Sequence, residues 1–476
     1  MDAPKYQRIH LALRRQIDDG LLRPGERLPS IRRIAADHGV SVITAQHALH
    51  QLERDGLAQA QHRARFVVCA PATTPRLPGP SAPPLTVPDA VLRTILEVLQ
   101  QHPRELPLGG STLGPSHIPD RLLRRLETDA YRRLGSALYG YEVAPGNAEL
   151  RRAIARRVGL GGQPPDADDV TLTHGCMDAL RLALEATTRE GDSVLVERPS
   201  FFGLYPLLQR LGRKVVELPF DPAQGLRADA VAAALAQHRI AAACLTPCYH
   251  NPTGALTPEP ERRAIGQLFA RQGIPLIEDD VYAELSHLGA RPTSMLALAP
   301  DADVITCGSV SKMLAPGLRL GWAVRRRRLP GDRYRDLTTA QFTSSIATAT
   351  AAQAVVARLL VDGGLDRHLA RLRPALQQQV SAYRQRILQH FPAGTTVTRP
   401  QGGFLLWVAL PTPRDPLWLM RAAREIGVGL VPGCAFSLGG DADHCLRLSA
   451  GHVLTPAIER AIADLGQLLS QERALP

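Results

Sequence analysis

Short apolar runs alternate with helix-like segments along most of the chain. The apolar runs occupy residues 170–175, 193–199, 241–247, 274–280 and 303–309. Segments such as 176–190 and 260–273 lie between them and carry helical patterns of apolar residues. Near-continuous apolar strands separated by helices are typical of a buried, mostly parallel sheet sandwiched by helices. We therefore predict an α/β fold for this part of the chain.

The first seventy residues have a different pattern. Residues 5–20 form an amphipathic helical stretch, and two further helical segments start after Ser30 and Ser41, which are suitable helix caps. A tight turn at Gly39 joins these two segments, and residues 58–68 resemble a short hairpin, or wing. Two helices joined by a short glycine-containing turn form a helix-turn-helix, whose second helix enters the major groove of DNA.

A stretch rich in proline, alanine, threonine and serine separates the two patterns. Residues 70–88 read APATTPRLPGPSAPPLTVP, a composition that stays extended and cannot pack a core. We expect a DNA-binding domain at residues 1–69, a linker at 70–92 and a large domain at 93–476. The length of 476 residues agrees with two or three domains.

Charge and cysteine content add two constraints. The net charge of +11 suits a polyanionic partner, although arginine-rich composition also arises in GC-rich genomes. Residues 1–70 carry eleven Lys and Arg against seven Asp and Glu, a net +4 that favours a nucleic-acid partner for this domain. The seven scattered cysteines indicate free thiols in a reducing cytoplasm and no metal site, and no apolar run reaches membrane-spanning length. We expect a soluble cytoplasmic protein.

Candidate chemistry is concentrated where the predicted strands end, because ligands bind beyond the carboxyl ends of strands in such sheets. Lys312 is one of only three lysines and follows the strand at 303–309. A lysine amine becomes chemically useful when it forms a Schiff base, above all with pyridoxal phosphate. Asp279 ends another strand and can hydrogen-bond the pyridine nitrogen, which keeps the ring protonated as an electron sink.

A phosphate clamp can be assembled nearby. Arg319 follows a Pro-Gly turn that can fold it back toward Lys312, and Ser309 and Ser311 flank the lysine. The turn before Cys176 opens a helix, whose free amide groups hold phosphate well.

Four motifs, in their usual order, resemble the fold-type I aminotransferases of class I and II. They are THGCMDAL (173–180), HNPTG (250–254), EDDVYAE (278–284) and GSVSKMLAPGLRLGW (308–322), and the likeness covers roughly residues 100 to 460. The resemblance implies a mostly parallel sheet sandwiched by helices, with a smaller α+β subdomain at the C-terminal end. It also implies that Lys312 is the Schiff-base lysine and Asp279 the pyridinium partner. It implies further cofactor-binding roles for Asn251, Tyr282, Phe201, Ser309, Ser311, Arg319, Gly175 and Cys176.

The same resemblance implies a dimer and a carboxylate ligand. Tyr141 matches a tyrosine that reaches the phosphate of the neighbouring subunit, and Arg447 matches the arginine that pairs with a substrate carboxylate. Alternatives remain: Tyr139 competes with Tyr141, Phe201 could be a core residue, and Arg447 could be a solvated edge arginine. His174 and His250 flank the site, lack metal-ligand spacing, and are interpreted as pocket lining.

The N-terminal segments LPSIRRIA (28–35) and HGVSVITAQHAL (38–49) resemble the winged helix-turn-helix of GntR-type regulators. This resemblance implies that Arg32 and Ser41 meet phosphate and that Thr44 and Gln46 reach base edges. The tip of the wing lacks the family's glycine, although Arg63 and Arg65 would still suit phosphate.

The joined architecture resembles the MocR subgroup of GntR regulators. It implies a domain-swapped homodimer that binds double-stranded operator DNA and senses pyridoxal phosphate, or a small amino acid or amine through it, at Lys312. A second hypothesis is a competent aminotransferase with an accessory DNA-binding domain, because HNPTG is the form found in working aminotransferases. A third is that pyridoxal phosphate alone is the effector.

Overall fold

The computed structural model describes residues 5–18, 21–23, 25–55, 57–61, 65–68, 84–100, 105–326 and 336–471. The chain divides into two compact units, residues 1–76 and 77–476, and each is described by itself. No helix in the described ranges combines the length and the apolar character needed to cross a bilayer.

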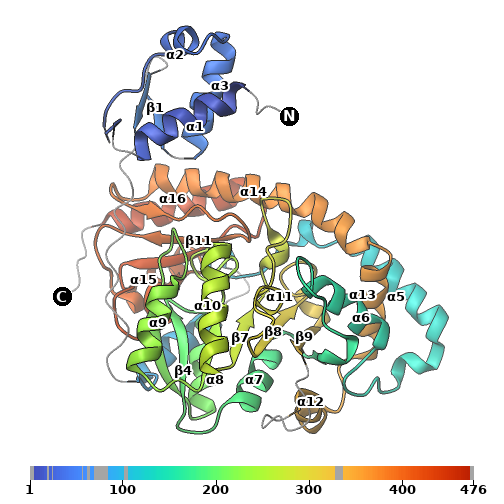
Figure 1. Ribbon diagram of the computed structural model, residues 1–476. Helices are drawn as coiled ribbons and strands as arrows, with labels where there is room; N and C mark the ends of the chain where they lie inside the picture. Colours follow the sequence, from blue (N-terminus) through green and yellow to red (C-terminus); the bar gives the residue numbers. More distant parts are fainter. Residues whose placement is uncertain are drawn as a thin grey trace. The chain divides into compact units, whose positions relative to one another are not determined.

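The first unit contains three helices and a two-stranded antiparallel hairpin (Figure 1). These elements are α1 (Lys5–Asp18), α2 (Ile31–Asp37), α3 (Val42–Arg54), β1 (Ala58–Gln61) and β2 (Arg65–Val68). The predicted caps are confirmed: the Ser30 side chain accepts a hydrogen bond from the amide of Arg33, and Ser41 accepts one from Thr44. Helix α3 buries one face, made by Ala45, Ala48, Leu49 and Leu52, in the core of this unit.

The second unit is built on a seven-stranded sheet of order β3-β9-β8-β7-β6-β4-β5. The strands are β3 (Val170–Thr173), β4 (Ser193–Arg198), β5 (Lys214–Pro219), β6 (Ala242–Leu245), β7 (Leu276–Asp279), β8 (Val304–Ser309) and β9 (Gly321–Arg325). Only β9 runs against the others, since it pairs antiparallel with both β3 and β8. The carboxyl ends of the remaining strands therefore lie at one edge, and the predicted mostly parallel sheet is confirmed.

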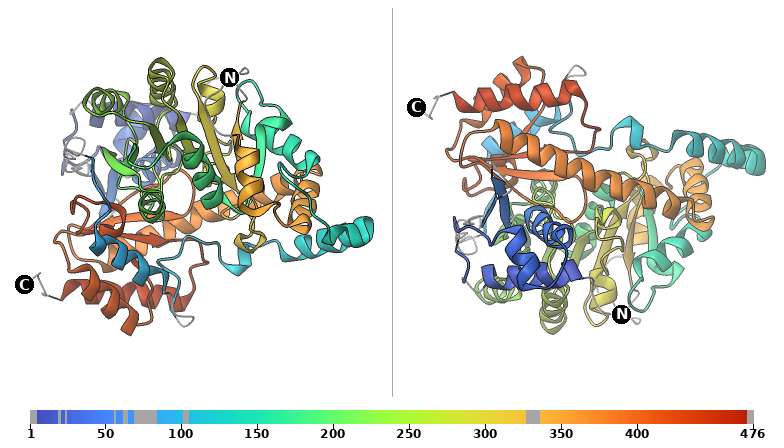
Figure 2. Two further views of the ribbon diagram at one scale, coloured as in Figure 1. Left: turned by 90° about the horizontal axis from the view of Figure 1, so that it is seen from below. Right: turned by 90° about the horizontal axis from the view of Figure 1, so that it is seen from above.

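Helices cover this sheet and extend beyond it (Figures 1 and 2). They are α4 (Asp89–Leu99), α5 (Asp120–Leu134), α6 (Ala148–Val158), α7 (Cys176–Thr187), α8 (Leu204–Arg210), α9 (Ala228–Gln237), α10 (Glu259–Gln272), α11 (Met295–Leu298), α12 (Leu337–Ser345), α13 (Thr350–Val361), α14 (Gly364–His390), α15 (Pro416–Glu425) and α16 (Pro456–Ser470). Both views of Figure 2 show α5, drawn in cyan, projecting from one end of the unit.

A smaller antiparallel sheet, of order β10-β11-β13-β12, forms the C-terminal part. Its strands are β10 (Thr396–Val397), β11 (Leu405–Ala409), β12 (Val431–Pro432) and β13 (Cys445–Ser449). The long helix α14 packs along α16 and leads from the large sheet to this small one (Figure 2, right). This is the α+β subdomain that the resemblance to fold-type I aminotransferases implied.

The last residues of the stretch expected to be a linker are part of the second unit. Leu85 exchanges backbone hydrogen bonds with Val215 of β5, at 2.7 and 2.8 Å, and α4 begins at Asp89, before the expected boundary at residue 92. The reason is visible in the residue types, because the apolar side chains of Val87 and Ile95 are buried there.

Candidate functional site

The carboxyl edge of the large sheet brings the predicted site residues together. Strands β3, β7 and β8 end at Thr173, Asp279 and Ser309, and all three strands run in the same direction. Lys312 follows three residues after the end of β8. The sequence argument from strand ends therefore located the ionisable groups on one edge.

Lys312 is held by a segment that sequence reasoning missed. Its Nζ atom donates hydrogen bonds to the backbone oxygen of Ser111, at 2.7 Å, and to its Oγ, at 2.9 Å. Burial and, to a smaller extent, the charge of Arg447 lower the pKa of Lys312 to about 8, while the carboxylate of Asp279 acts in the opposite direction. A substantial fraction of the amine is thus neutral and nucleophilic near physiological pH.

Asp279 is a buried carboxylate at the end of β7. Burial raises its pKa to about 6, while a 3.4 Å hydrogen bond from the thiol of Cys176 and the charge of Lys312 act in the opposite direction. Such a group is suited to a cationic partner, because pairing with a positive charge restores the stabilisation of its ionised form that burial removes.

The predicted phosphate-binding residues surround the start of α7. Gly175 has φ +90°, and a Cβ there would lie 2.8 Å from Nη2 of Arg319. The same Nη2 donates to the backbone oxygen of His174 at 2.9 Å, so Arg319 does fold back to the amide end of the helix. Ser309 and Ser311 are buried beside the lysine, and the amide of Ser311 donates to Oγ of Ser309 at 3.3 Å.

Arg447 is among the most deeply buried large side chains, with 1% of its surface exposed, so the solvated-edge alternative is wrong. It lies on β13 and donates to the backbone oxygen of Gly109 at 2.5 Å and to Oδ1 of Asn251 at 3.1 Å. Its guanidinium carbon lies 5.4 Å from the ring centre of Phe202 and 5.2 Å from that of Phe436. Burial lowers its pKa to about 10, which leaves it charged at neutral pH. Among the residues that the structure describes, no carboxylate pairs with it.

Three further predicted residues line the same region. Asn251 and Tyr282 are buried, and burial raises the pKa of Tyr282 to about 12, with Arg447 and Ser111 acting in the opposite direction. Phe201 is partly exposed and in a tilted contact with Phe202, at 5.3 Å between ring centres. A plain core residue would belong to the hydrophobic core cluster, and Phe201 does not belong to it.

The two histidines differ from each other. His250 is fully buried and stacks on Phe220 at 3.9 Å, and burial lowers its pKa to about 3, so it stays neutral. His174 is partly exposed and contributes its backbone oxygen to Arg319.

Tyr141 and its rival Tyr139 both have 79% of their surface exposed. They follow α5, the helix that projects from the unit in Figure 2, on which Tyr131 is also more than half exposed. Nothing within the single chain decides between the two tyrosines.

Ser111 and Gly109 are the functional residues that sequence reasoning missed. Together they contact the two site cations, Lys312 and Arg447. The available signal was the run LGGST (108–112), which contains a glycine pair in a segment without a periodic pattern. Close packing explains the first of these glycines. A Cβ at Gly109 would lie 2.8 Å from the Cα of Leu430.

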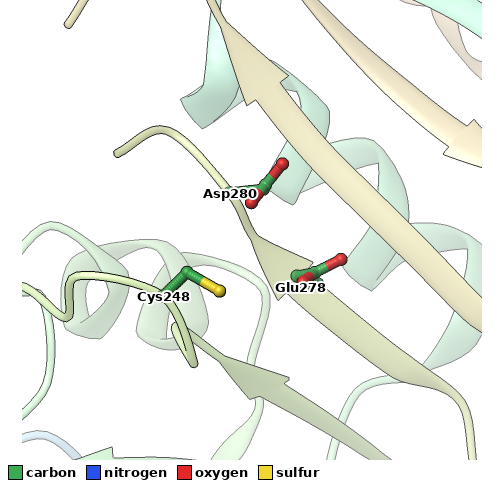
Figure 3. Close-up of side chains that lie close together, drawn as sticks. All are labelled: Cys248, Glu278 and Asp280. Carbon is green, nitrogen blue, oxygen red and sulfur yellow. The ribbon is translucent and has the colours of Figure 1, made fainter. Parts of the chain in front are cut away.

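A second cluster of ionisable groups lies in the interior behind the site. Cys248, Glu278 and Asp280 lie close together (Figure 3), with candidate ligand atoms within 4.8 Å of one another, near enough to be considered as metal ligands. However, Glu278 already accepts hydrogen bonds from the amide of Met295, at 2.9 Å, and from Thr306, at 2.7 Å, while Arg291 pairs with Asp280. Burial also raises the pKa of the Cys248 thiol to about 12. We therefore interpret this group as a charge cluster balanced by arginine.

On the first unit, the predicted DNA contacts differ in how available they are. Arg32 and Gln46 are exposed, whereas Thr44 is partly buried and shares a 2.8 Å hydrogen bond with the hydroxyl of Ser41. Arg63 lies outside the described residues. Arg65 begins β2, and its side chain is likewise outside the described part.

The site residues fit pyridoxal phosphate on three observations. The partly neutral amine of Lys312 lies near the buried carboxylate of Asp279. Helix α7 starts at a glycine, Gly175, against which Arg319 packs. The buried Arg447 has an Nε without a hydrogen-bond partner in the described structure. The lysine amine suits the aldehyde of the cofactor, and the carboxylate suits its ring nitrogen. The helix start with its arginine suits the phosphate, and the buried arginine is a cation for a ligand anion.

The chain is similar to proteins of two families. Residues 116–465 match the family Aminotransferase class I and II, and residues 5–68 match the family Bacterial regulatory proteins, gntR family. The chain is 34% identical over 470 residues to the uncharacterized HTH-type transcriptional regulator YjiR of Escherichia coli, covering 97% of this chain and 98% of YjiR. It is 31% identical over 387 residues to the 2-aminoadipate transaminase of Thermus thermophilus, covering 80% of this chain and 95% of the transaminase.

A solved structure shows the same fold. It is LysN, an alpha-aminoadipate aminotransferase from Thermus thermophilus complexed with N-(5'-phosphopyridoxyl)-L-leucine, with a TM-score of 0.72 and 30% identity over 79% of this chain and 94% of LysN. The large domain thus has the fold-type I architecture, and its cofactor is pyridoxal phosphate. The chain belongs to the MocR-type GntR regulators, in which a gntR-family helix-turn-helix is joined to an aminotransferase class I and II domain.

Proposed function

We propose that this regulator changes its binding to operator DNA when an α-amino acid occupies the pyridoxal phosphate site. The observation that carries the proposal is Arg447, a buried guanidinium that the described residues leave without a carboxylate, close enough to Lys312 to lower its pKa. An amine-reactive group and an anion-binding group in one pocket match the two ends of an amino acid. A planar guanidinium suits a carboxylate better than lysine would, because it can donate two parallel hydrogen bonds.

Each site residue has a defined task. Lys312 would supply the amine that holds the cofactor, and the amine of the ligand would replace it. Asp279 would pair with the ring nitrogen, and Arg319, Ser309, Ser311 and the amides at Gly175 and Cys176 would hold the phosphate. Asn251 and Tyr282 would contact the ring hydroxyl, and Phe201 would stack on the ring. When bound, pyridoxal phosphate supplies an aldehyde for amines and an electron-withdrawing ring.

A homodimer, domain-swapped in its arrangement, fits the exposed residues at one end of the second unit. The side chains of Tyr139, Tyr141 and Val143 are more than half exposed there, an unusual state for large apolar groups in neighbouring positions. In the proposed dimer Tyr141 reaches the phosphate in the other subunit. The dimer also presents two helix-turn-helix units to two half-sites of an operator in the cytoplasm.

The ligand can shift DNA binding only by binding two states of the protein with different affinity. The Gly109–Ser111 segment offers such a difference. It accepts hydrogen bonds from Lys312 and Arg447, and both cations acquire new partners when an amino acid binds. This segment follows α4, and α4 follows the stretch of chain between the two units. The loss of its hydrogen bonds to Lys312 and Arg447 is therefore well placed to alter the DNA-binding unit.

A second candidate function is transamination. The presence of Lys312, Asp279, Asn251 and Arg447 in one region supports this candidate, as does the 31% identity to the 2-aminoadipate transaminase of Thermus thermophilus. Repeated turnover with an amino donor and a keto acceptor would establish this activity.

The test of the regulator proposal is fluorescence anisotropy with DNA from upstream of the protein's own gene. We expect specific binding that changes on loading with pyridoxal phosphate and again with one member of an amino acid panel, and both responses should be lost in Lys312→Ala. A response to the cofactor without any response to amino acids would favour the cofactor as sole effector. No specific binding in any state would contradict the proposal for that DNA.

A further inference from the structure

The first turn of α3 exposes two branched apolar side chains. Ile43 has 78% of its surface exposed and Val42 has 50%, and no large aliphatic side chain among the described residues is more exposed than Ile43. Exposed single apolar residues are common on protein surfaces. Two neighbours at the start of the recognition helix of a helix-turn-helix are different, because the N-terminal residues of that helix contact base edges.

The packing of α3 fixes which way these residues point. The helix buries Ala45, Ala48, Leu49 and Leu52, so the opposite face carries Ile43, Gln46 and His50 at helical spacing. Gln46 lies one turn after Ile43 and reaches Nε2 of His50 at 3.4 Å. Ile43 is therefore the first side chain of the face that the unit leaves open.

The polar neighbours of Ile43 are largely engaged within the helix. The Ser41 hydroxyl accepts from the amide of Thr44 at 3.2 Å and shares a 2.8 Å hydrogen bond with the Thr44 hydroxyl. His47 stacks on Tyr6 of α1, with ring centres 4.2 Å apart. Among the described side chains at the start of α3, Val42 and Ile43 are consequently exposed together with the polar side chain of Gln46.

The groups around this apolar pair suit nucleic acid. Arg32 and Arg33 of α2 are exposed, and Arg33 forms a 3.7 Å ion pair with Asp37, which is itself more than half exposed. Arginines on the preceding helix can hold phosphate while the first turn of the recognition helix lies in the major groove. In that groove the 5-methyl group of thymine is the apolar feature that distinguishes one base from the others.

We propose that Ile43, with Val42 beside it, contacts thymine methyl groups in the major groove, so that the half-site carries thymine opposite the first turn of α3. Gln46, one turn further, is then placed to pair with an adjacent adenine. The inference rests on the proposed DNA binding and adds the base that this turn selects.

The test uses full-length protein and a substitution that removes only the methyl group. Duplexes are first selected from a randomised pool, and each thymine of the selected half-site is then replaced by deoxyuridine. We expect one or two positions at which the loss of the methyl group weakens binding about fourfold. This corresponds to the ~0.8 kcal/mol that the burial of one aliphatic carbon contributes. Ile43→Ala should bind thymine and deoxyuridine duplexes equally well at one of these positions.

The control is Leu21→Ala, which removes another strongly exposed side chain of the same unit outside α3 and should keep the preference for thymine. Ile43 is too exposed for its truncation to disturb folding, so equal unfolding curves are expected for all three proteins. Specific binding that ignores deoxyuridine at every position would overturn the inference and leave the proposed function intact. Specific binding unchanged in Ile43→Ala, with an altered oligomeric state, would assign the apolar pair to a second copy of the chain. A failure to select any duplex would overturn both proposals.

Discussion

The amino group of Lys312 donates hydrogen bonds to both oxygens of Ser111, a residue 201 positions earlier in the chain. An ammonium group with two acceptors is stabilised, whereas burial and the charge of Arg447 favour the neutral amine. The balance of these effects sets the pH at which the lysine can attack the cofactor.

We expect the rate of pyridoxal phosphate loading onto apo-protein to rise with pH and to level off above about 8, because the lowered pKa of Lys312 makes the neutral amine predominant there. Ser111→Ala removes one acceptor of the ammonium form. It should lower that pKa further and move the profile to lower pH by up to about one unit. Stopped-flow absorbance of the bound cofactor measures both profiles. Thr112→Ala, which removes the neighbouring exposed hydroxyl, should leave the profile in place, and a midpoint near 10.5, the ordinary lysine value, would contradict the role of burial.

Replacement of Arg447 by leucine should separate binding of the cofactor from binding of amino acids. The variant removes the one described cation positioned for a ligand carboxylate, and truncation of one partner of a buried charge pair typically costs ~2–5 kcal/mol. We expect at least a thirtyfold loss of affinity for the effector amino acid, about 2 kcal/mol. Spectral titration of the loaded protein measures this loss.

The ligand itself provides the control for Arg447→Leu. The amine that corresponds to the effector without its carboxylate should bind wild type and variant with similar affinity. The variant should also load the cofactor with its pH profile moved upward, because the charge of Arg447 lowers the pKa of Lys312. Equal losses for the amino acid and the amine would show that Arg447 supports the fold and not the carboxylate.

Gly175→Ala tests the phosphate cradle. A side chain there must adopt φ +90° and would meet Nη2 of Arg319 at 2.8 Å, so we expect strain of ~1–2 kcal/mol and displacement of the arginine. Affinity for pyridoxal phosphate should fall at least about tenfold, since a charge-assisted hydrogen bond contributes ~1.5–3 kcal/mol. Gly273→Ala also requires a positive φ, +64°, in the left-handed helical region and with open space around it, and it should lose stability in urea without losing cofactor affinity.

Much of the fold could be predicted because its signals are local. The caps at Ser30 and Ser41 depend on amides three residues away, and the apolar runs coincide with β3, β4, β6, β7 and β8. Lys312 and Asp279 could be located because parallel strands end at one edge and their chemistry is distinctive.

Other features depend on packing between distant segments. The sequence around Arg447 resembles an exposed edge strand as much as a buried one. Its burial depends on distant segments, which supply the rings of Phe202 and Phe436, the side chain of Asn251 and the backbone at Gly109. The contact of Ser111 with Lys312 joins the first and the middle part of the second unit. No periodic pattern reports such a contact, because it is made by a loop.

The two tyrosines at 139 and 141 lead to the last prediction. Both are 79% exposed in the single chain, yet the proposed dimer gives only Tyr141 a task, at the phosphate of the other subunit. Tyr141→Phe should weaken binding of pyridoxal phosphate by about three- to tenfold, the loss of one hydrogen bond, whereas Tyr139→Phe should have no effect. Hybrid dimers give a readout that a structural role cannot produce. When Tyr141→Phe chains are mixed with Lys312→Ala chains, one of the two sites in each hybrid combines an intact Lys312 with the partner subunit's intact Tyr141. That site should recover wild-type cofactor affinity, and an absence of recovery would place the tyrosine within its own chain's site or outside any site.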